Sequence, residues 1–254
     1  MERLSGRFWE IDCLRGLAVI LMLAYHFLYD LDFFRLADIE LRSGIFYFMG
    51  RSAAFLFILI SGTALSISHS RALEGRSSEK SQENFYKYLR RGVRLFSMGL
   101  IITGITWLFF PGQYILFGIL HFFGLSAVIA YPFLKYGKEN LFFGLFFGII
   151  GLYLRERTFD FSFLLWLGLR PEGFATLDYF PLLPWFGVFL TGIFFGNSLY
   201  KGGIRQFKIP VSDEFRLQKP VSWIGKHSLS IYFIHQPLFL GLLILAGFLD
   251  PGVL

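Results

Sequence analysis

The sequence predicts an all-α membrane protein, a polytopic helix bundle of about seven to eight transmembrane helices in a single domain covering residues 1–254. The first observation is composition. Hydrophobic residues make up 55% of the chain, charged residues only 17%, and the mean hydropathy is +0.56, whereas soluble domains carry about 25% charged residues. The second observation is that long apolar runs alternate with short polar segments along the whole chain, as in successive membrane crossings.

The apolar segments follow one another with short connections. We expect membrane spans at about residues 13–34, 44–68, 85–110, 113–134, 141–154, 179–199 and 227–249. The segment 161–169 is also apolar, but as a helix it would reach only about 14 Å across a hydrocarbon core of about 30 Å. It is therefore predicted to be interfacial or re-entrant. The polar stretches 69–84 and 200–226 are predicted to be loops.

The distribution of Lys and Arg predicts the orientation. With the N-terminus in the cytoplasm, the inner segments hold 17 basic residues and the outer segments hold 5, leaving Arg15 and Arg51 inside spans. This bias favours an inner N-terminus and an outer C-terminus. The net charge of +6 is therefore explained first by basic loops on the cytoplasmic side, and only second by binding of an anionic ligand.

Several classes of function are disfavoured. Cys13 is the one cysteine, so no internal disulfide can form. No metal-ligand set is predicted. The basic residues lie in short loops between spans, which disfavours nucleic-acid binding. The first apolar run lacks a small-residue cleavage site, so it is not expected to be a cleavable signal. The expected partner is the lipid bilayer, and a homodimer is compatible with the sequence.

The first span, IDCLRGLAVILMLAYHFLYD, carries groups that hydrocarbon disfavours. Arg15 and His26 are eleven positions apart, which returns to nearly the same helix face, and Asp30 lies one turn beyond His26. Ionisable residues inside a membrane usually face a cavity or a partner. The other spans are expected to surround this stripe.

His26 and Asp30 are the candidate catalytic residues. A histidine with a carboxylate one turn away suits general-base chemistry, because the carboxylate can fix the tautomer and stabilise the imidazolium. A structural histidine bonded to a neighbouring helix is the alternative. By helical rise, His26 and His121 fall at similar depth, whereas His235 should lie nearer the cytoplasm.

The candidate cofactor-binding residues are basic and lie at inner helix ends: Arg15, Arg90, Arg91 and Arg94. Arg15 could instead reach the inner headgroups, and the other three are also what the topological bias requires. Further candidate pocket residues are His121, His235, Gln236, Trp185 and Arg51. Arg51 needs a partner, with Asp30 or Asp32 as candidates. A packing role for His235 and Gln236 is equally open, and Trp185 after Pro184 is first interpreted as a helix start with an interfacial anchor.

Four blocks of the chain also resemble a known family. An Arg, ten residues and a His in the first span are similar to the signature of the acyltransferase-three superfamily. The first span, then YILFGILHFFGLS, PLLPWFGVFLTGI and WIGKHSLSIYFIHQPL, resemble the heparan-alpha-glucosaminide N-acetyltransferase catalytic-domain family. The resemblance extends from Ile11 to Leu240. The chain departs from the glucosaminide branch in having no histidine in the connection after the first span, where that branch places a candidate histidine; the next histidine after His26 is His69.

The resemblance implies a membrane acyltransferase in the cell membrane of a microbe. It would take an acyl group, such as acetyl, from cytoplasmic acyl-CoA and transfer it to an amine or hydroxyl of a sugar or another envelope component. It implies His26 near the chemistry and Arg15 on the path of the CoA. Direct attack on the thioester and a histidine acyl-enzyme are both open. The alternatives are a small proton-coupled transporter that uses the buried stripe and a partner-dependent component with a degenerate site.

Overall fold

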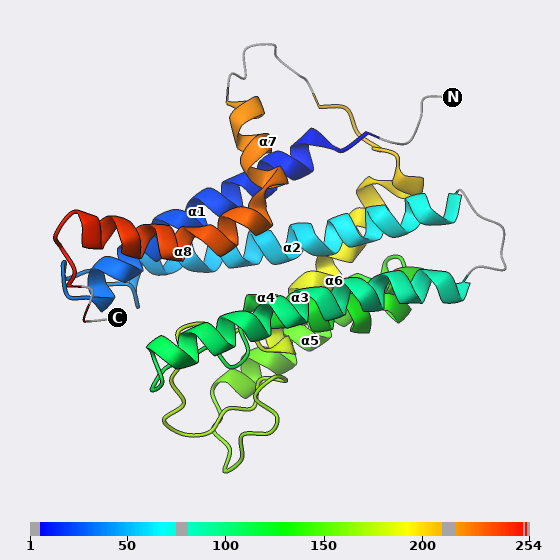
Figure 1. Ribbon diagram of the computed structural model, residues 1–254. Helices are drawn as coiled ribbons and strands as arrows, with labels where there is room; N and C mark the ends of the chain where they lie inside the picture. Colours follow the sequence, from blue (N-terminus) through cyan, green and yellow to red (C-terminus); the bar gives the residue numbers. More distant parts are fainter. Residues whose placement is uncertain (1–5, 75–80, 210–216, 251, 253–254) are drawn as a thin grey trace. The chain divides into compact units, whose positions relative to one another are not determined.

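The computed structural model describes residues 6–74, 81–209, 217–250 and 252. Its elements in chain order are α1 (Trp9–Phe33), α2 (Gly44–Glu74), α3 (Ser81–Phe109), α4 (Ile119–Ile129), the 3-10 helix η2 (Tyr131–Lys135), α5 (Glu139–Arg155), α6 (Leu182–Leu199), the 3-10 helix η3 (Lys201–Gly203), α7 (Gln218–Lys226) and α8 (Ser228–Leu245) (Figure 1). Over the described ranges there is no strand, only an isolated bridge between Phe117 and Tyr179. The predicted all-α membrane bundle is confirmed.

Five described helices are long and apolar enough to cross a membrane: α1, α2, α3, α6 and α8. The predicted spans at 113–134 and 141–154 are shorter as helices. The first of them consists of α4, with 11 residues, followed by η2, where Pro132 lies at the start of the 3-10 turn. The second is α5, with 17 residues. The apolar composition located these two segments correctly. It did not give the ends of their helices, because local turns determine where each helix begins and ends.

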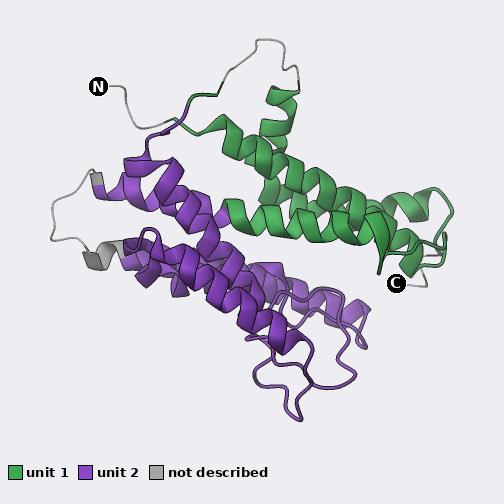
Figure 2. Ribbon diagram, turned by 180° about the vertical axis from the view of Figure 1, so that it is seen from behind, with its two compact units in different colours: residues 1–60, 208–254 green, residues 61–207 purple. Residues whose placement is uncertain are grey.

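The chain forms two compact units (Figure 2). Unit 1 comprises residues 1–60 and 208–254, and unit 2 comprises residues 61–207. The helix α2 contributes its first half to unit 1 and its second half to unit 2. Arg15, His26 and Asp30, the polar residues of the first predicted span, all belong to unit 1.

Unit 1 is built on α1, which packs against α7 in its first half and against α8 in its second half. The helices α1 and α7 contact each other through their backbones at glycine positions. A Cβ on Gly16 would overlap the carbonyl of Val221, and a Cβ on Gly225 would overlap the carbonyl of Asp12. Small residues let two helices approach this closely. The helix α7 lies within the predicted polar loop 200–226, so the prediction of a loop over that whole stretch was wrong.

Unit 2 is held by two close helix pairs. Gly92 of α3 and Gly124 of α4 each face the other's carbonyl, and Gly144 of α5 and Gly187 of α6 do the same. Aromatic side chains fill the space beside the second pair, with Phe133, Phe147 and Phe186 in mutual edge contact. These contacts leave the remaining faces of α3 and α5 exposed and apolar, as lipid contact requires.

The segment 156–181 contains no helix, which agrees with the expectation that 161–169 does not span. Backbone hydrogen bonds hold it: the Phe159 amide donates to Arg170, and the Leu182 amide donates to Trp166. The Tyr179 hydroxyl donates to the Leu165 carbonyl at 2.7 Å. Burial raises the pKa of Tyr179 to about 12, so this donor stays protonated at neutral pH.

Candidate active site

Two imidazoles meet between α1 and α8. The ring centroids of His26 and His235 are 4.9 Å apart, with an angle of 65° between the ring planes. His235 is buried and His26 is half-buried. Both histidines were candidates from the sequence, and the structure brings them together. The resulting pair is the centre of the candidate site.

The hydrogen bonds of this pair fix both tautomers. The Nδ1 atom of His26 lies 2.9 Å from the Met22 carbonyl, and the Nδ1 atom of His235 lies 2.7 Å from the Tyr232 carbonyl. A carbonyl oxygen can only accept, so each Nδ1 carries the hydrogen in a neutral ring and each Nε2 presents a lone pair. The His235 Nε2 atom is buried and has no hydrogen-bond partner in the described structure. Both rings are therefore held as bases.

Asp30 contacts Gln236 instead of orienting His26. The Gln236 Nε2 atom donates to Asp30 Oδ1 at 3.2 Å. The predicted role of Asp30 as the group that fixes the His26 tautomer is corrected, because the Met22 carbonyl occupies Nδ1. A carbonyl four residues earlier on the same helix reaches the ring without any second helix. Sequence spacing alone placed the carboxylate and the backbone carbonyl equally close to the imidazole.

His235 lies at the level of His26, not nearer the cytoplasm as the helical rise predicted. The prediction assumed that the first and last spans begin at the same depth. In the structure α7 packs on the first half of α1, with Gly225 against Asp12, so α8 begins farther along α1. The two helices then run in the same direction (Figure 1). This parallel course agrees with first and last spans that both run outwards.

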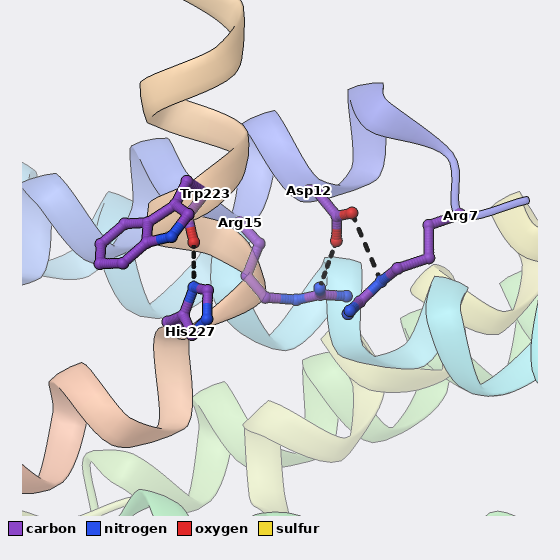
Figure 3. Close-up of polar contacts among 5 residues, drawn as sticks. All are labelled: Arg7, Asp12, Arg15, Trp223 and His227. Carbon is purple, nitrogen blue, oxygen red and sulfur yellow. Dashed lines mark hydrogen bonds and ion pairs between the residues drawn. The ribbon is translucent and has the colours of Figure 1, made fainter.

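Arg15 lies at the other end of the α1 stripe and is paired. Its Nη1 atom is 3.0 Å from Oδ1 of Asp12, which is 2% exposed, and Arg7 approaches the same carboxylate at 3.5 Å (Figure 3). Figure 3 also shows Trp223 and His227 at the junction of α7 and α8, where the His227 Nδ1 donates to the Trp223 carbonyl. Arg15 is thus held in place by a buried acid. Eleven residues separate it from His26, about 16 Å of helix.

His121, in unit 2, has a hydrogen-bond partner at each ring nitrogen. The Gly118 amide donates to its Nδ1 atom at 3.3 Å, so the hydrogen is on Nε2, which faces the Thr103 hydroxyl oxygen at 3.4 Å. That hydroxyl donates to the Ile115 carbonyl, which leaves its oxygen to accept. The ring is 1% exposed and lies between Phe96 and Phe117. Both nitrogens are occupied, unlike those of the His26 and His235 pair.

Arg51 and Trp185 have local partners. The Arg51 guanidinium lies over the Tyr47 ring at 5.4 Å. The two predicted acids have contacts elsewhere: Asp30 accepts from Gln236, and Asp32 accepts from the Ile39 amide. The Trp185 ring lies 5.1 Å from Phe180 in the first turn of α6, which is the predicted helix-start role.

The basic residues of α3 form a single exposed stripe, which we call the α3 basic stripe: Lys87, Arg90, Arg91 and Arg94. Helical geometry places it about 140° around α3 from Gly92 and Gly99, which pack on α4. Farther along the same face lie exposed apolar side chains: Ile101, Ile105 and Leu108. An apolar face that ends in cations is typical of a helix meeting lipid headgroups.

One buried histidine contact was missed. His69 lies near the end of the predicted span 44–68, where a solvated side chain would be expected, but its Nδ1 atom lies 2.9 Å from the hydroxyl of Tyr88, which is 2% exposed. Within the described ranges, no group of three His, Cys, Asp or Glu side chains is placed to hold a metal ion.

Comparison with protein families identifies the chain. The model of the family described as heparan-alpha-glucosaminide N-acetyltransferase, catalytic, matches residues 7–237. The chain belongs to this family. The match begins just before α1 and ends at Pro237 of α8, so it includes both histidines of the candidate site. The family is one of membrane acetyltransferases, and the five apolar helices make this member an integral membrane protein. Neither the curated proteins nor the solved structures contain a match to the chain.

Proposed function

We propose that the protein transfers an acyl group, in the first instance acetyl, from acyl-CoA to an amine or hydroxyl of a sugar or other envelope component in the cell membrane of a microbe. The observation that carries the proposal is the pair of imidazoles between α1 and α8, each of which uses Nδ1 for a backbone carbonyl and keeps the lone pair of Nε2. The chain that holds this pair belongs to an acetyltransferase family. The transporter alternative has no comparable support and is not taken further.

In the proposed step His26 is the general base. Its Nε2 lone pair takes the proton of the acceptor, and the acceptor's nitrogen or oxygen attacks the thioester carbonyl carbon. The carbon–sulfur bond breaks, and the CoA thiolate takes a proton from the His26 imidazolium. Direct transfer needs one base in contact with the acceptor, and the Met22 carbonyl supplies the orientation that this base requires.

For the donor, we propose that Arg15 lies on the path of the CoA. It is on the same helix as His26 at a separation of about 16 Å, which an extended pantetheine arm can span. Its pairing with Asp12 holds the guanidinium in one place. The α3 basic stripe is better explained by headgroups, since it continues an exposed apolar face.

The test uses two measurements on the full chain in detergent. His26→Ala should abolish thiol release from acetyl-CoA in the presence of acceptors while leaving the melting temperature within a few degrees of the wild type. Calorimetry should show acetyl-CoA binding to the wild type and binding about tenfold or more weaker to Arg15→Ala, since a charge-assisted contact to phosphate is lost. A wild-type rate of transfer by His26→Ala would contradict the role of His26 as the general base. No binding of acetyl-CoA to the folded wild type would contradict the proposed acyl transfer.

A further inference from the structure

The helix α7 crosses the two long helices of unit 1 that it contacts. In Figure 1, α1 and α8 run side by side and α7 lies across them. Both α1 and α8 are long and apolar enough to span a membrane, so a helix that crosses them lies near the membrane plane. The close contacts of α7 on α1 are at Asp12 and Gly16, within the first eight residues of α1. This is the end of a span, where the membrane surface lies.

The two faces of α7 differ in burial and charge. Ser222 and Gly225 are buried, and Gly225 meets the Asp12 carbonyl of α1. The side chains of Lys219, Trp223 and Lys226 are exposed. Spacings of four and three residues make these three side chains neighbours on one stripe of the helix. No residue of α7 is acidic. The face that points away from α1 is therefore cationic.

The exposed face also changes in character around the helix. At about 100° per residue, Lys219 and Lys226 lie within about 20° of each other, and Trp223 follows about 40° beyond Lys219. Pro220 and then Leu217, which directly precedes α7, come next in the same direction. Trp223 is 58% exposed and Leu217 is 64% exposed. The order from ammonium groups through indole to aliphatic side chain matches the order from headgroups to hydrocarbon at a membrane boundary.

A neighbouring imidazole supports the exposed indole. The ring centroids of Trp223 and His227 are 4.4 Å apart, with 36° between the ring planes. The His227 Nδ1 atom donates to the Trp223 carbonyl at 2.9 Å, which holds the imidazole beside the indole (Figure 3). An indole held in this way presents an apolar ring and one N–H donor, the combination that places tryptophan at membrane interfaces.

We propose that α7 is an interfacial helix and that its exposed face, made of Lys219, Trp223 and Lys226, binds the phosphate groups of anionic phospholipids. The charge of the face selects anionic over zwitterionic lipid, because its two ammonium groups have no acidic residue of α7 beside them. The predicted orientation puts this end of α1 at the cytoplasmic leaflet, where anionic lipids attract basic segments. The α3 basic stripe belongs to unit 2 and is a separate contact. The inference does not depend on the proposed acyl transfer.

The nucleotide end of acyl-CoA also combines phosphate with an aromatic ring. The continuation of the face into Pro220 and Leu217 favours lipid, because acyl chains cover exposed aliphatic side chains and a nucleotide in water does not. The proposal therefore commits to lipid, and the experiment includes a nucleotide probe.

The experiment measures quenching of Trp223 fluorescence by brominated lipids, with the full chain in nanodiscs. The signal of Trp223 is the difference in emission between the wild type and Trp223→Phe. Two nanodiscs have the same mixture of phosphatidylglycerol and phosphatidylcholine, and bromine is on the acyl chains of one lipid or the other. Brominated phosphatidylglycerol should quench Trp223 about twofold or more strongly than brominated phosphatidylcholine. Lys219→Gln combined with Lys226→Gln should remove this difference and retain quenching by both lipids.

The matched control replaces Arg90, Arg91 and Arg94 with Gln, which removes more positive charge from unit 2 and should leave the difference at Trp223 unchanged. If Trp223→Phe does not fold, a bimane label on a cysteine replacing Leu217, in a Cys13→Ser background, measures the same face. Equal quenching by the two lipids in the wild type overturns the proposal. Quenching by aqueous iodide and by neither lipid also overturns it, because α7 would then lie in water. Adenosine 3′,5′-bisphosphate should not relieve the quenching, and relief would assign the face to the nucleotide instead.

Discussion

His26, His121 and His235 differ in how many ring nitrogens are already occupied. His121 has a donor at Nδ1 and an acceptor at Nε2, so it has no capacity left for a substrate. His26 and His235 each use one nitrogen for a carbonyl of their own helix. That bond leaves a lone pair pointing away from the helix. Hydrogen bonding, and not depth or burial, therefore distinguishes His121 from His26 and His235.

This difference predicts opposite effects of two substitutions. His121→Ala should lower the free energy of unfolding by about 2–4 kcal/mol, because it opens a cavity and leaves the Gly118 amide unpaired. The folded fraction should keep its transfer rate. Thermal denaturation in detergent and thiol release measured on the same samples check this. Loss of transfer at an unchanged melting temperature would place His121 in the chemistry.

At the scale of elements, α7 sets the position of α8. The nine residues of α7 pack on α1 through glycines, and α8 follows after a single residue. Any displacement of α7 is therefore passed directly to His235. Phe27, which follows His26 directly, and Phe239, one turn after His235, have ring centroids 5.5 Å apart and report the same contact between α1 and α8.

Gly225→Ala should break this alignment, because its Cβ would overlap the Asp12 carbonyl. Transfer should fall about tenfold or more, since small misplacements of catalytic groups are costly. Cysteines at Phe27 and Phe239, in a Cys13→Ser background, should cross-link in the parent and less in Gly225→Ala. Gly241→Ala is the control, because nothing lies within 4 Å of its Cβ. Equal cross-linking in all three proteins would contradict the role of α7.

The α3 basic stripe gives a second prediction at this scale. Replacing Arg90, Arg91 and Arg94 with Gln should leave the acetyl-CoA dissociation constant within about threefold of the wild type, because the stripe faces away from α4 and continues an exposed apolar face. Calorimetry beside Arg15→Ala measures this. A loss of affinity as large as that of Arg15→Ala would assign the stripe to the donor.

At the scale of the whole molecule, the direction of the helices bears on topology. The helices α1 and α8 run in parallel, and the segment 156–181 contains no helix. With the basic loops inside, this favours an outer C-terminus. A cysteine placed at Phe248, with Cys13 replaced by Ser, should react with a membrane-impermeant maleimide in intact cells, whereas one at Gly6 should react only after lysis. The reverse pattern would invert the topology.

Much of this organisation could be predicted from the sequence, and the predictions that were wrong have physical causes. Apolar runs located the spans, and the spacing of Arg15, His26 and Asp30 predicted that the three share one face of the first helix. The helix α7 was missed because it is short, lies in a polar stretch and depends on backbone contact between distant glycines, which no local pattern contains. Because α7 was missed, the predicted depth of His235 was wrong. Gln236 was missed as the partner of Asp30 because their contact depends on how α1 and α8 pack together.

The candidate site is formed by the first and last long helices of the chain. During synthesis on the ribosome, α1 enters the bilayer with His26 and Asp30 long before α8 leaves the exit tunnel. Every nascent chain therefore carries only half of the site until α8 is made. A product that stops before α8 has the imidazole of His26 without that of His235, and the carboxylate of Asp30 without the amide of Gln236.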